Sequence, residues 1–245
     1  IDKAGNGYAV IRFLPEVEGD DAPFVAVYSH AFKGKGGWLF ENCPTTLGEK
    51  CPICQANTEL WNSGIEDDKN IARNRKRKLA YISNILVIED PANPENKGKH
   101  FLYQYGTKIF QKIQSLAHPE YQDEVAVDPF NFWTGADFKI KIRNVGGYVN
   151  YDRSEFAAPA PLFGGDDKKL EELWKKQYSL REFTDKSQFK SFEELQARLK
   201  KATGDDIRAQ FTESRSIEDD VKDTVAEEDV EEKDPLKYFS EMEND

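Results

Sequence analysis

The sequence predicts an α+β fold that is rich in β-structure, with a small barrel and peripheral helices. Short segments with aromatic and β-branched residues recur between Gly, Pro and Asp breaks through the first two-thirds of the chain. Segments of helical periodicity interrupt and follow them. The strand segments have long connections, which favours a small barrel over a βαβ sheet.

Six segments are predicted to be strands: 8–14, 24–32, 38–41, 79–88, 100–105 and 138–143. The last segment alternates most clearly. Its apolar positions are Phe138, Ile140 and Ile142. The intervening positions are the cations Lys139, Lys141 and Arg143. Because successive strand side chains point to opposite faces, this strand would present apolar groups to a core and cations to solvent or to a ligand.

Four segments have apolar residues at three- and four-residue spacing and are predicted to be helices: 53–62, 107–117, 168–178 and 189–202. At the start of the last helix, Ser191 and Glu194 have the spacing of a capping box. Gly204 follows it and is a suitable stop signal. The sequence shows no internal repeat.

The charge of the chain is unevenly distributed. The 245 residues include 45 acidic and 34 basic side chains, and this net charge of −11 argues against a nucleic-acid binder. However, residues 205–245 contain 16 acidic and 5 basic side chains, so residues 1–204 carry no net charge. We therefore expect a folded core over 1–204 and an acidic C-terminal tail over 205–245 that is largely disordered, because so few large apolar groups cannot offset ordering entropy.

The sequence also suggests where the protein is located. Apolar stretches such as residues 85–88 are far shorter than the roughly 20 residues of a membrane helix, and no signal-like segment is visible. We expect a soluble, intracellular protein without membrane contact, whose native N-terminus is missing because the chain lacks an initiating Met. Three cysteines suggest reduced thiols or a metal site rather than a disulfide framework.

The cysteines and one histidine have the spacing of a zinc site. Cys51 and Cys54 form a C-x-x-C pair, with Cys43 and His30 upstream. A redox pair or simple buried thiols are alternatives, and His100 or His118 could replace His30. Four protein ligands leave no position for water, and the H-x-E motif of zinc deaminases is absent, so we expect one structural Zn²⁺ in a subdomain around residues 30–72.

A basic run precedes the fourth predicted strand and is followed by several tyrosines. The run places five cations within residues 73–78. Cations that follow a backbone, beside rings that stack on bases, are the two components of single-strand binding. A solvated loop or localisation patch is the alternative for the run, and each tyrosine could instead belong to the core.

Several motifs resemble the single-stranded DNA-binding (helix-destabilising) proteins of T-even-type bacteriophages. They include residues 4–15, the His30 to Cys54 cluster, 76–78, 84–91, 94–96, 150–152 and 190–195. The resemblance implies an OB-fold, which is a five-stranded Greek-key barrel, with a zinc-bearing subdomain. It also implies non-sequence-specific single-stranded DNA binding in phage DNA replication, recombination and repair.

The resemblance and the charge pattern together define candidate residues. The implied zinc ligands are His30, Cys43, Cys51 and Cys54. The candidate DNA-contacting residues are Arg12, Trp61, Arg73, Arg75, Lys76, Arg77, Lys78, Tyr81, Tyr103, Tyr105, Lys139, Lys141, Arg143, Tyr148 and Tyr151. Relative to the family pattern, Leu79 and Ala80 follow the basic run where the family has Thr/Ser, and Gln104 replaces a cation.

The resemblance further implies partners and a location. The acidic tail, with the short apolar patch at 235–239, would recruit a polymerase, a helicase loader and a recombination mediator, or compete with DNA for the basic groove; a purely solubilising tail is the alternative. Self-association on DNA is possible, although the basic N-terminal arm that drives it in the family is missing. The expected location is the cytoplasm of the infected bacterial host.

Two other classes of function remain open from the residues. A zinc-dependent nucleic-acid-modifying enzyme would need an open metal position and a paired acid or base, and neither is visible. A zinc-containing scaffold or transcription accessory protein would keep the zinc and the tail without needing the tyrosines. The sequence therefore favours a non-enzymatic single-stranded DNA-binding protein.

Overall fold

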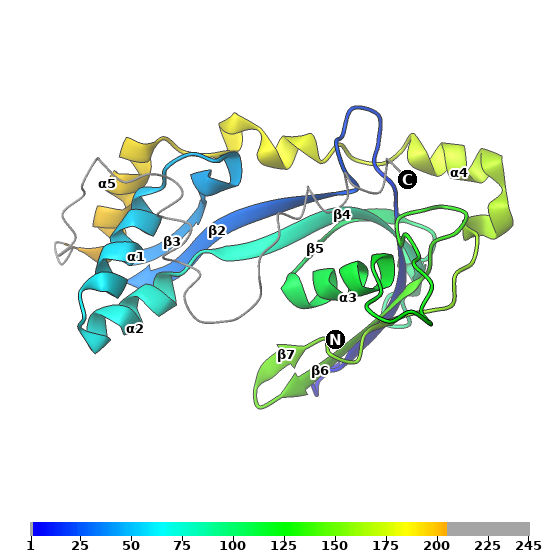
Figure 1. Ribbon diagram of the computed structural model, residues 1–245, viewed down its shortest axis with the longest axis horizontal. Coiled ribbons are helices and arrows are strands. Elements are labelled where there is room, and N and C mark those ends of the chain that lie inside the picture. The colour runs from blue at the N-terminus through cyan, green and yellow to red at the C-terminus, as the bar shows by residue number, and fades with distance from the viewer. Residues whose placement is uncertain (1, 205–245) are drawn as a thin grey trace. The chain divides into compact units, whose positions relative to one another are not determined.

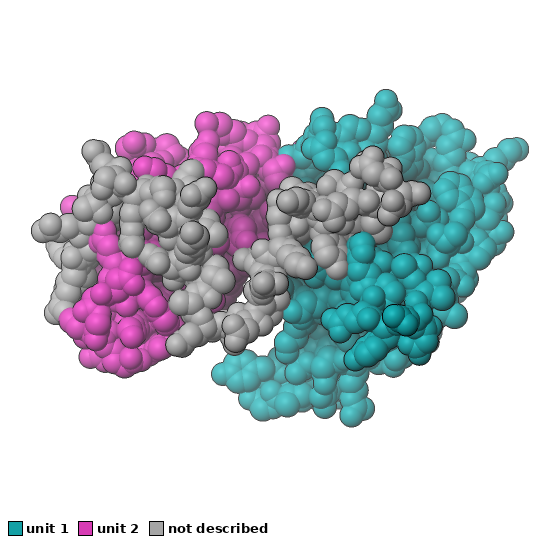
Figure 2. Space-filling model, viewed as in Figure 1, with its two compact units in different colours: residues 1–25, 81–181 teal, residues 26–80, 182–245 magenta. Residues whose placement is uncertain are grey.

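The computed structural model describes residues 2–204, which form two compact units (Figure 2). Of the described residues, unit 1 contains 2–25 and 81–181, and unit 2 contains 26–80 and 182–204. The predicted acidic tail at 205–245 lies outside the described residues. The chain passes from unit 1 to unit 2 within strand β2 (Phe24–Gly34) and returns within strand β4 (Lys78–Glu89).

Unit 1 is built on antiparallel strands. Strand β1 (Gly7–Phe13) pairs with β4 on one side and with β6 (Phe138–Val145) on the other. Strand β5 (His100–Tyr105) pairs with β4, while β7 (Tyr148–Asn150) and β8 (Glu155–Phe156) pair with β6. Phe13, at the end of β1, is fully buried. Its ring lies 5.5 to 5.8 Å from the rings of Tyr105, Phe130 and Phe138, so aromatic packing forms the centre of this unit.

Two helices complete unit 1. Helix α3 (Thr107–Ala117) buries Ile109, Phe110 and Ile113, at the spacing of one helical face. Helix α4 (Asp167–Trp174) buries Leu170 and Leu173. The Asp166 side chain accepts a hydrogen bond from the backbone N–H of Lys169 and so caps the start of α4.

Unit 2 combines a β-hairpin with three helices. Strands β2 and β3 (Gly37–Asn42) pair antiparallel, and α1 (Pro52–Asn62), α2 (Glu66–Arg75) and α5 (Phe192–Thr203) gather beside them (Figure 1). All three cysteines belong to the apolar core of this unit, together with residues of β2, β3, α1 and α5. The backbone N–H of Gly36 donates to the Ala202 carbonyl at 2.8 Å. A Cβ at Gly36 would lie 1.9 Å from the Lys201 carbonyl oxygen, so glycine permits this close approach of α5.

The predicted α+β character and the six predicted strands are confirmed, each strand to within a few residues. The capping box at Ser191 and Glu194 is present, and α5 ends at Gly204 as predicted. Helix α4 is shorter than predicted: it ends at Trp174, and the N–H of Lys176 bonds to the Leu173 carbonyl in a tighter turn. Within residues 2–204, no helix has both the length and the hydropathy that crossing a bilayer requires.

Candidate metal centre and nucleic-acid interface

His30, Cys43, Cys51 and Cys54 converge in unit 2. Their ligand atoms all lie within 4.8 Å of one another, and all four residues are buried. His30 Nε2 lies 3.5 Å from Cys51 Sγ and 3.6 Å from Cys54 Sγ. The sulfurs of Cys43 and Cys54 are 3.6 Å apart. The structure therefore brings together the four residues predicted as ligands, whereas His100 lies in unit 1 against Tyr178.

Three local structures position these ligands. His30 lies in β2, and Cys43 immediately precedes a short 3₁₀ turn (Pro44–Leu47). Cys51 is the N-cap of α1, and Pro52 occupies the first helical position, where its fixed φ suits helix entry. Cys51 and Cys54 therefore lie at the positive end of a helix, where negative charge on sulfur is stabilised.

The spacing fits a tetrahedral metal ion. Metal–sulfur bonds of about 2.3 Å and a metal–nitrogen bond of about 2.0–2.1 Å produce tetrahedron edges of about 3.8 Å between sulfurs and about 3.6 Å between sulfur and nitrogen. The measured separations lie close to both values. Hydrogen bonding from Cys51 and Cys54 lowers the pKa of the Cys43 thiol, while burial raises the pKa of Cys51. Protein groups alone thus favour one thiolate, and a bound cation would stabilise all three.

The candidate metal ligands are connected to the basic run by hydrogen bonds. His30 Nδ1 lies 3.2 Å from the backbone oxygen of Arg75. Since a carbonyl oxygen only accepts, Nδ1 carries the proton and Nε2 is left to face the sulfurs. A second connection runs through Thr45: its hydroxyl oxygen accepts from the Arg77 guanidinium at 2.8 Å and can donate its own proton to Cys43 Sγ, 3.1 Å away.

Each arginine of the basic run lies over an aromatic ring of unit 2. Arg73 is 5.2 Å from the centroid of Trp61, and it also forms an ion pair with Glu66 at 2.8 Å. Arg75 is 5.4 Å from the Phe32 ring, and Arg77 is 4.1 Å from the Tyr28 ring. These cation–π contacts orient the arginines. Lys76 and Lys78 are exposed.

The predicted tyrosines of unit 1 fall into two groups. Tyr148 is 79% exposed on β7, whereas Tyr103 and Tyr151 are half-buried. Burial raises the pKa of Tyr103, and the nearby Tyr151 phenol raises it further. In contrast, Tyr81 is 2% exposed and Tyr105 is 4% exposed.

The buried tyrosines have partners inside the core. Tyr81 stacks on Phe110 with ring centroids 3.8 Å apart and planes 6° apart. The Tyr105 hydroxyl shares a hydrogen bond of 2.9 Å with the Ser83 hydroxyl. A base stacks only on an accessible ring face, so the burial of Tyr81 and Tyr105 assigns both to the core rather than to direct base contact.

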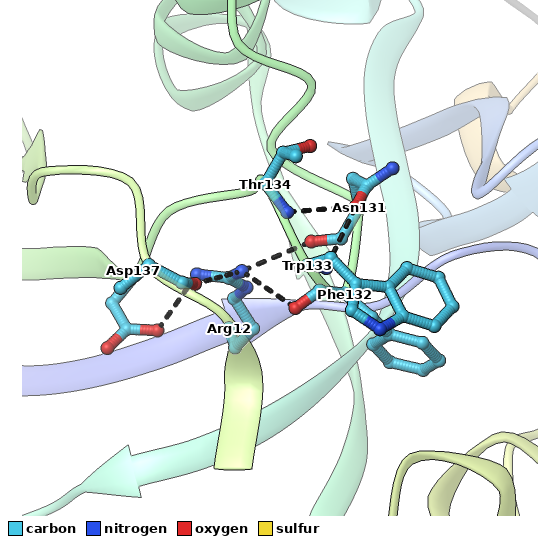
Figure 3. Close-up of polar contacts among 7 residues, drawn as sticks. Arg12, Asn131, Phe132, Trp133, Thr134 and Asp137 are labelled. Atoms are coloured by element: carbon cyan, nitrogen blue, oxygen red, sulfur yellow. Dashed lines mark hydrogen bonds and ion pairs between the residues drawn. The ribbon is translucent and has the colours of Figure 1, made fainter. Parts of the chain in front are cut away.

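Arg12 is also internal, with only 1% of its surface exposed. Its guanidinium donates to the Asn131 carbonyl oxygen at 3.1 Å and forms an ion pair with Asp137 at 3.4 Å (Figure 3). It also donates to the Ala160 carbonyl oxygen at 2.8 Å. The predicted contact between Arg12 and DNA therefore does not agree with its position. Arg12 instead fixes the loop that contains Phe132 and Trp133.

The cations on β6 lie on the predicted face but already have partners. Lys141 forms an ion pair with Glu155 at 2.7 Å, and Arg143 forms one with Asp152. These pairs lower the pKa of both carboxyl groups. Lys139 is opposite Glu155 in the β6–β8 register. A phosphate approaching this face would compete with two exposed carboxylates.

Two residues of the metal centre's surroundings were not among the candidates. Thr45 joins Cys43 to Arg77, and Tyr28 supports Arg77 through its ring. The Tyr28 carbonyl also accepts from the Cys43 backbone N–H at 2.8 Å. The sequence offered one local signal for Thr45, which is its position two residues after Cys43. Its bond to Arg77 could not be predicted, because Arg77 is distant in the sequence.

The chain is similar to known DNA-binding proteins. Residues 5–203 match the family described as "gp32 DNA binding protein like". Two relatives described as single-stranded DNA-binding proteins, from Enterobacteria phages T2 and T4, are each 41% identical over 210 residues, which is 83% of this chain and 68% of theirs. A protein of the same description from Enterobacteria phage RB70 is 44% identical over 85 residues, which is 33% of this chain and 69% of that relative.

Proposed function

Because the chain belongs to the gp32-like family of DNA-binding proteins, we propose that it coats and protects single-stranded DNA without sequence preference. It would act in phage DNA replication, recombination and repair, in the cytoplasm of an infected bacterium. The observation that carries this proposal furthest is the direct bonding between the metal ligands and the basic run, through Arg75 and through Thr45. An ion bound by these ligands would hold the cations of the basic run in place, where they could contact the phosphates of a DNA strand.

The metal in this proposal is one structural Zn²⁺. Three cysteines and a histidine form a donor set that zinc prefers, and four protein donors complete its tetrahedral shell. The ion would hold β2, α1 and the basic run in place, and it would leave no position for a reactive water. We therefore propose a binding protein rather than an enzyme, with the strands of unit 1 as a barrel of the OB type.

The proposed DNA-contacting surface has two components. In unit 2, phosphates would contact the basic run, and Trp61 would be a further contact beside it. In unit 1, bases would stack on Tyr103, Tyr148 and Tyr151. The cations of the basic run are Arg73, Arg75, Lys76, Arg77 and Lys78, and the cations proposed on β6 are Lys139, Lys141 and Arg143. Arg12, Tyr81 and Tyr105 would act only by supporting this surface from the core.

The proposed role of residues 205–245 depends on their charge. This segment carries the whole net negative charge of the chain, so it would compete with DNA for the basic run. It would also recruit replication and recombination proteins through the apolar patch at 235–239.

A fluorescence titration tests the proposal. Quenching of intrinsic Trp and Tyr fluorescence by poly(dT) should occur without any product being formed, and duplex DNA of equal length should compete poorly. Raising salt should weaken binding, because counterion release on single strands contributes a slope of about −0.7 per neutralised phosphate. Salt-independent binding, a preference for duplex, or turnover of the strand would contradict the proposal.

A further inference from the structure

Unit 1 contains a groove that the proposed DNA-contacting residues do not use. It has a volume of about 620 Å³, within the range of about 300–1,000 Å³ that is typical of ligand sites. Its lining comes from residues 15–18, which follow β1, from Phe132 and Trp133, and from one side of α4. The groove is therefore formed by three segments that are distant in the sequence.

Helix α4 supplies one wall. Asp167, Leu170, Glu171 and Trp174 follow at intervals of three, one and three residues, so all four lie on one face of the helix. The Trp174 indole N–H donates to the Glu16 carbonyl oxygen at 2.8 Å. This bond fixes the wall against residues 15–18.

Trp133 also lines the groove and remains 54% exposed. Its backbone N–H donates to the Asn131 side-chain oxygen at 2.8 Å, and Asn131 is in turn held by Arg12 (Figure 3). Arg12 thus fixes the loop that contains Trp133, and the Trp133 ring remains exposed to solvent on this loop. Binding that covers such a preorganised ring costs little conformational entropy.

The rim of the groove is acidic. Glu16, Glu18 and Asp167 are exposed and have no ion-pair partner among the described residues, whereas Glu171 pairs with Lys175. The charge of Glu16 also acts on a half-buried neighbour. Burial raises the pKa of Asp128, and the negative charge of Glu16 raises it further. An apolar floor with a negative rim repels both a DNA backbone and the acidic residues 205–245.

We propose that this groove binds a cationic, apolar peptide segment of a partner protein. Aliphatic side chains would enter between Trp133 and Trp174, and Arg or Lys side chains would pair with the carboxylates or lie over the indoles. The acidic rim would attract the cations of such a segment, and the preformed aromatic groove would take its apolar side chains. It requires no DNA contact, so it stands or fails separately from the proposed function.

The test uses the full chain and a short fluorescein-labelled peptide of alternating Arg and Leu, with a Glu/Leu peptide of the same length as a charge control. Fluorescence anisotropy should show binding of the Arg/Leu peptide only. Trp133→Ala should weaken that binding about tenfold, and so should the double variant Glu16→Gln/Asp167→Asn. Poly(dT) affinity should be unchanged in both variants.

A matched variant separates the groove from overall charge. Asp123→Asn/Glu124→Gln removes two exposed carboxylates that do not line the groove. It should leave peptide affinity within about twofold of the original protein. Equal weakening in both double variants would overturn the proposal, because attraction to net charge would then explain binding. Retention of affinity in Trp133→Ala would also overturn it, as would a groove-dependent dimer in sedimentation, which would make the occupant a second copy.

Discussion

His30 and Arg75 share a hydrogen bond of 3.2 Å between the imidazole Nδ1 and the backbone oxygen. One partner is a candidate metal ligand, and the other belongs to the basic run. A hydrogen bond of this kind sets the tautomer of a ligating histidine and raises its basicity. It also means that movement of the ligand and movement of the run are coupled. Loss of the ion that His30 would bind should therefore also displace the basic run.

Removal of the metal should weaken both stability and DNA binding. Structural zinc contributes on the order of 10 kcal/mol in small domains, and about 1 kcal/mol shifts the unfolding midpoint of a domain of 150–250 residues by roughly 2–4 °C. We therefore expect Cys54→Ser to lose bound zinc and to lower the midpoint by about 10 °C or more. Calorimetry and zinc release by a chromogenic chelator measure the two effects. Chelation of the unmodified chain must reproduce them; unchanged poly(dT) affinity after chelation would contradict the bracing role.

Arg77 should require its guanidinium as well as its charge. It donates to Thr45 and lies over the Tyr28 ring, and a lysine ammonium reproduces neither geometry fully. Poly(dT) affinity should be highest in the unmodified protein, lower in Arg77→Lys and lowest in Arg77→Ala. The alanine variant should also reduce the salt slope by about 0.7. Lys168→Ala, which removes an exposed cation of α4, is the matched control and should change neither quantity.

Tyr148 and Tyr81 should respond differently to the same truncation. Tyr148→Ala removes an exposed ring and should cost about 1–3 kcal/mol of poly(dT) binding with little change in stability. Tyr81→Ala removes the ring stacked on Phe110 and should lower the free energy of unfolding by about 3–5 kcal/mol. Urea unfolding and fluorescence titration of both variants measure the two quantities. Reversal of the pattern would mean that the two rings have exchanged roles.

Arg12→Met should destabilise unit 1. The substitution removes the guanidinium donor of the Asn131 and Ala160 carbonyl oxygens, of which the first keeps the Gly135 N–H, and it removes the ion-pair partner of Asp137. We expect the free energy of unfolding to fall by about 2–4 kcal/mol. The control Arg153→Met lies at an exposed position of the same unit, and it should lower the free energy of unfolding by less than about 0.5 kcal/mol. Normal stability combined with lost DNA affinity would instead support direct contact between Arg12 and the strand.

Deletion of residues 205–245 should raise poly(dT) affinity at low salt. The deleted segment carries 16 acidic and 5 basic side chains and would otherwise compete for the cations. The difference between the two chains should shrink as salt rises, because screening weakens the competition. Equal affinity of the two chains at low salt would reject this competition, and recruitment of partners would remain as a separate hypothesis.

Local patterns predicted much of the fold. The alternation of Phe138 and Lys139 defines a strand, and the pairing of Ser191 with Glu194 defines a helix start, because each signal lies within a few residues. Helix α2 was not predicted: it buries only Asp68 and Ala72, so the apolar periodicity is nearly absent. It has acidic residues in its first turn and arginines in its last, which complement the helix dipole.

The candidate site was less predictable because burial is a property of the whole fold. The spacing of the cysteines predicted the candidate metal ligands, since a C-x-x-C pair at a helix start is a local arrangement. Nothing local distinguishes the buried Tyr81 from the exposed Tyr148, because both lie in strands with aromatic neighbours. The link from Cys43 through Thr45 to Arg77 joins residues that only tertiary packing brings together.

Unit 2 is assembled from two stretches of chain, with residues 81–181 between them. Its core includes the cysteines from the first stretch and Leu195 and Leu199 from the second. During synthesis, the ribosome therefore completes the ligand set long before it supplies the helix that closes over it. Until α5 emerges, the thiols lack the part of their apolar cover that Leu195 and Leu199 supply. The apolar cover of the four candidate ligands therefore depends on the helix that comes last among the described elements.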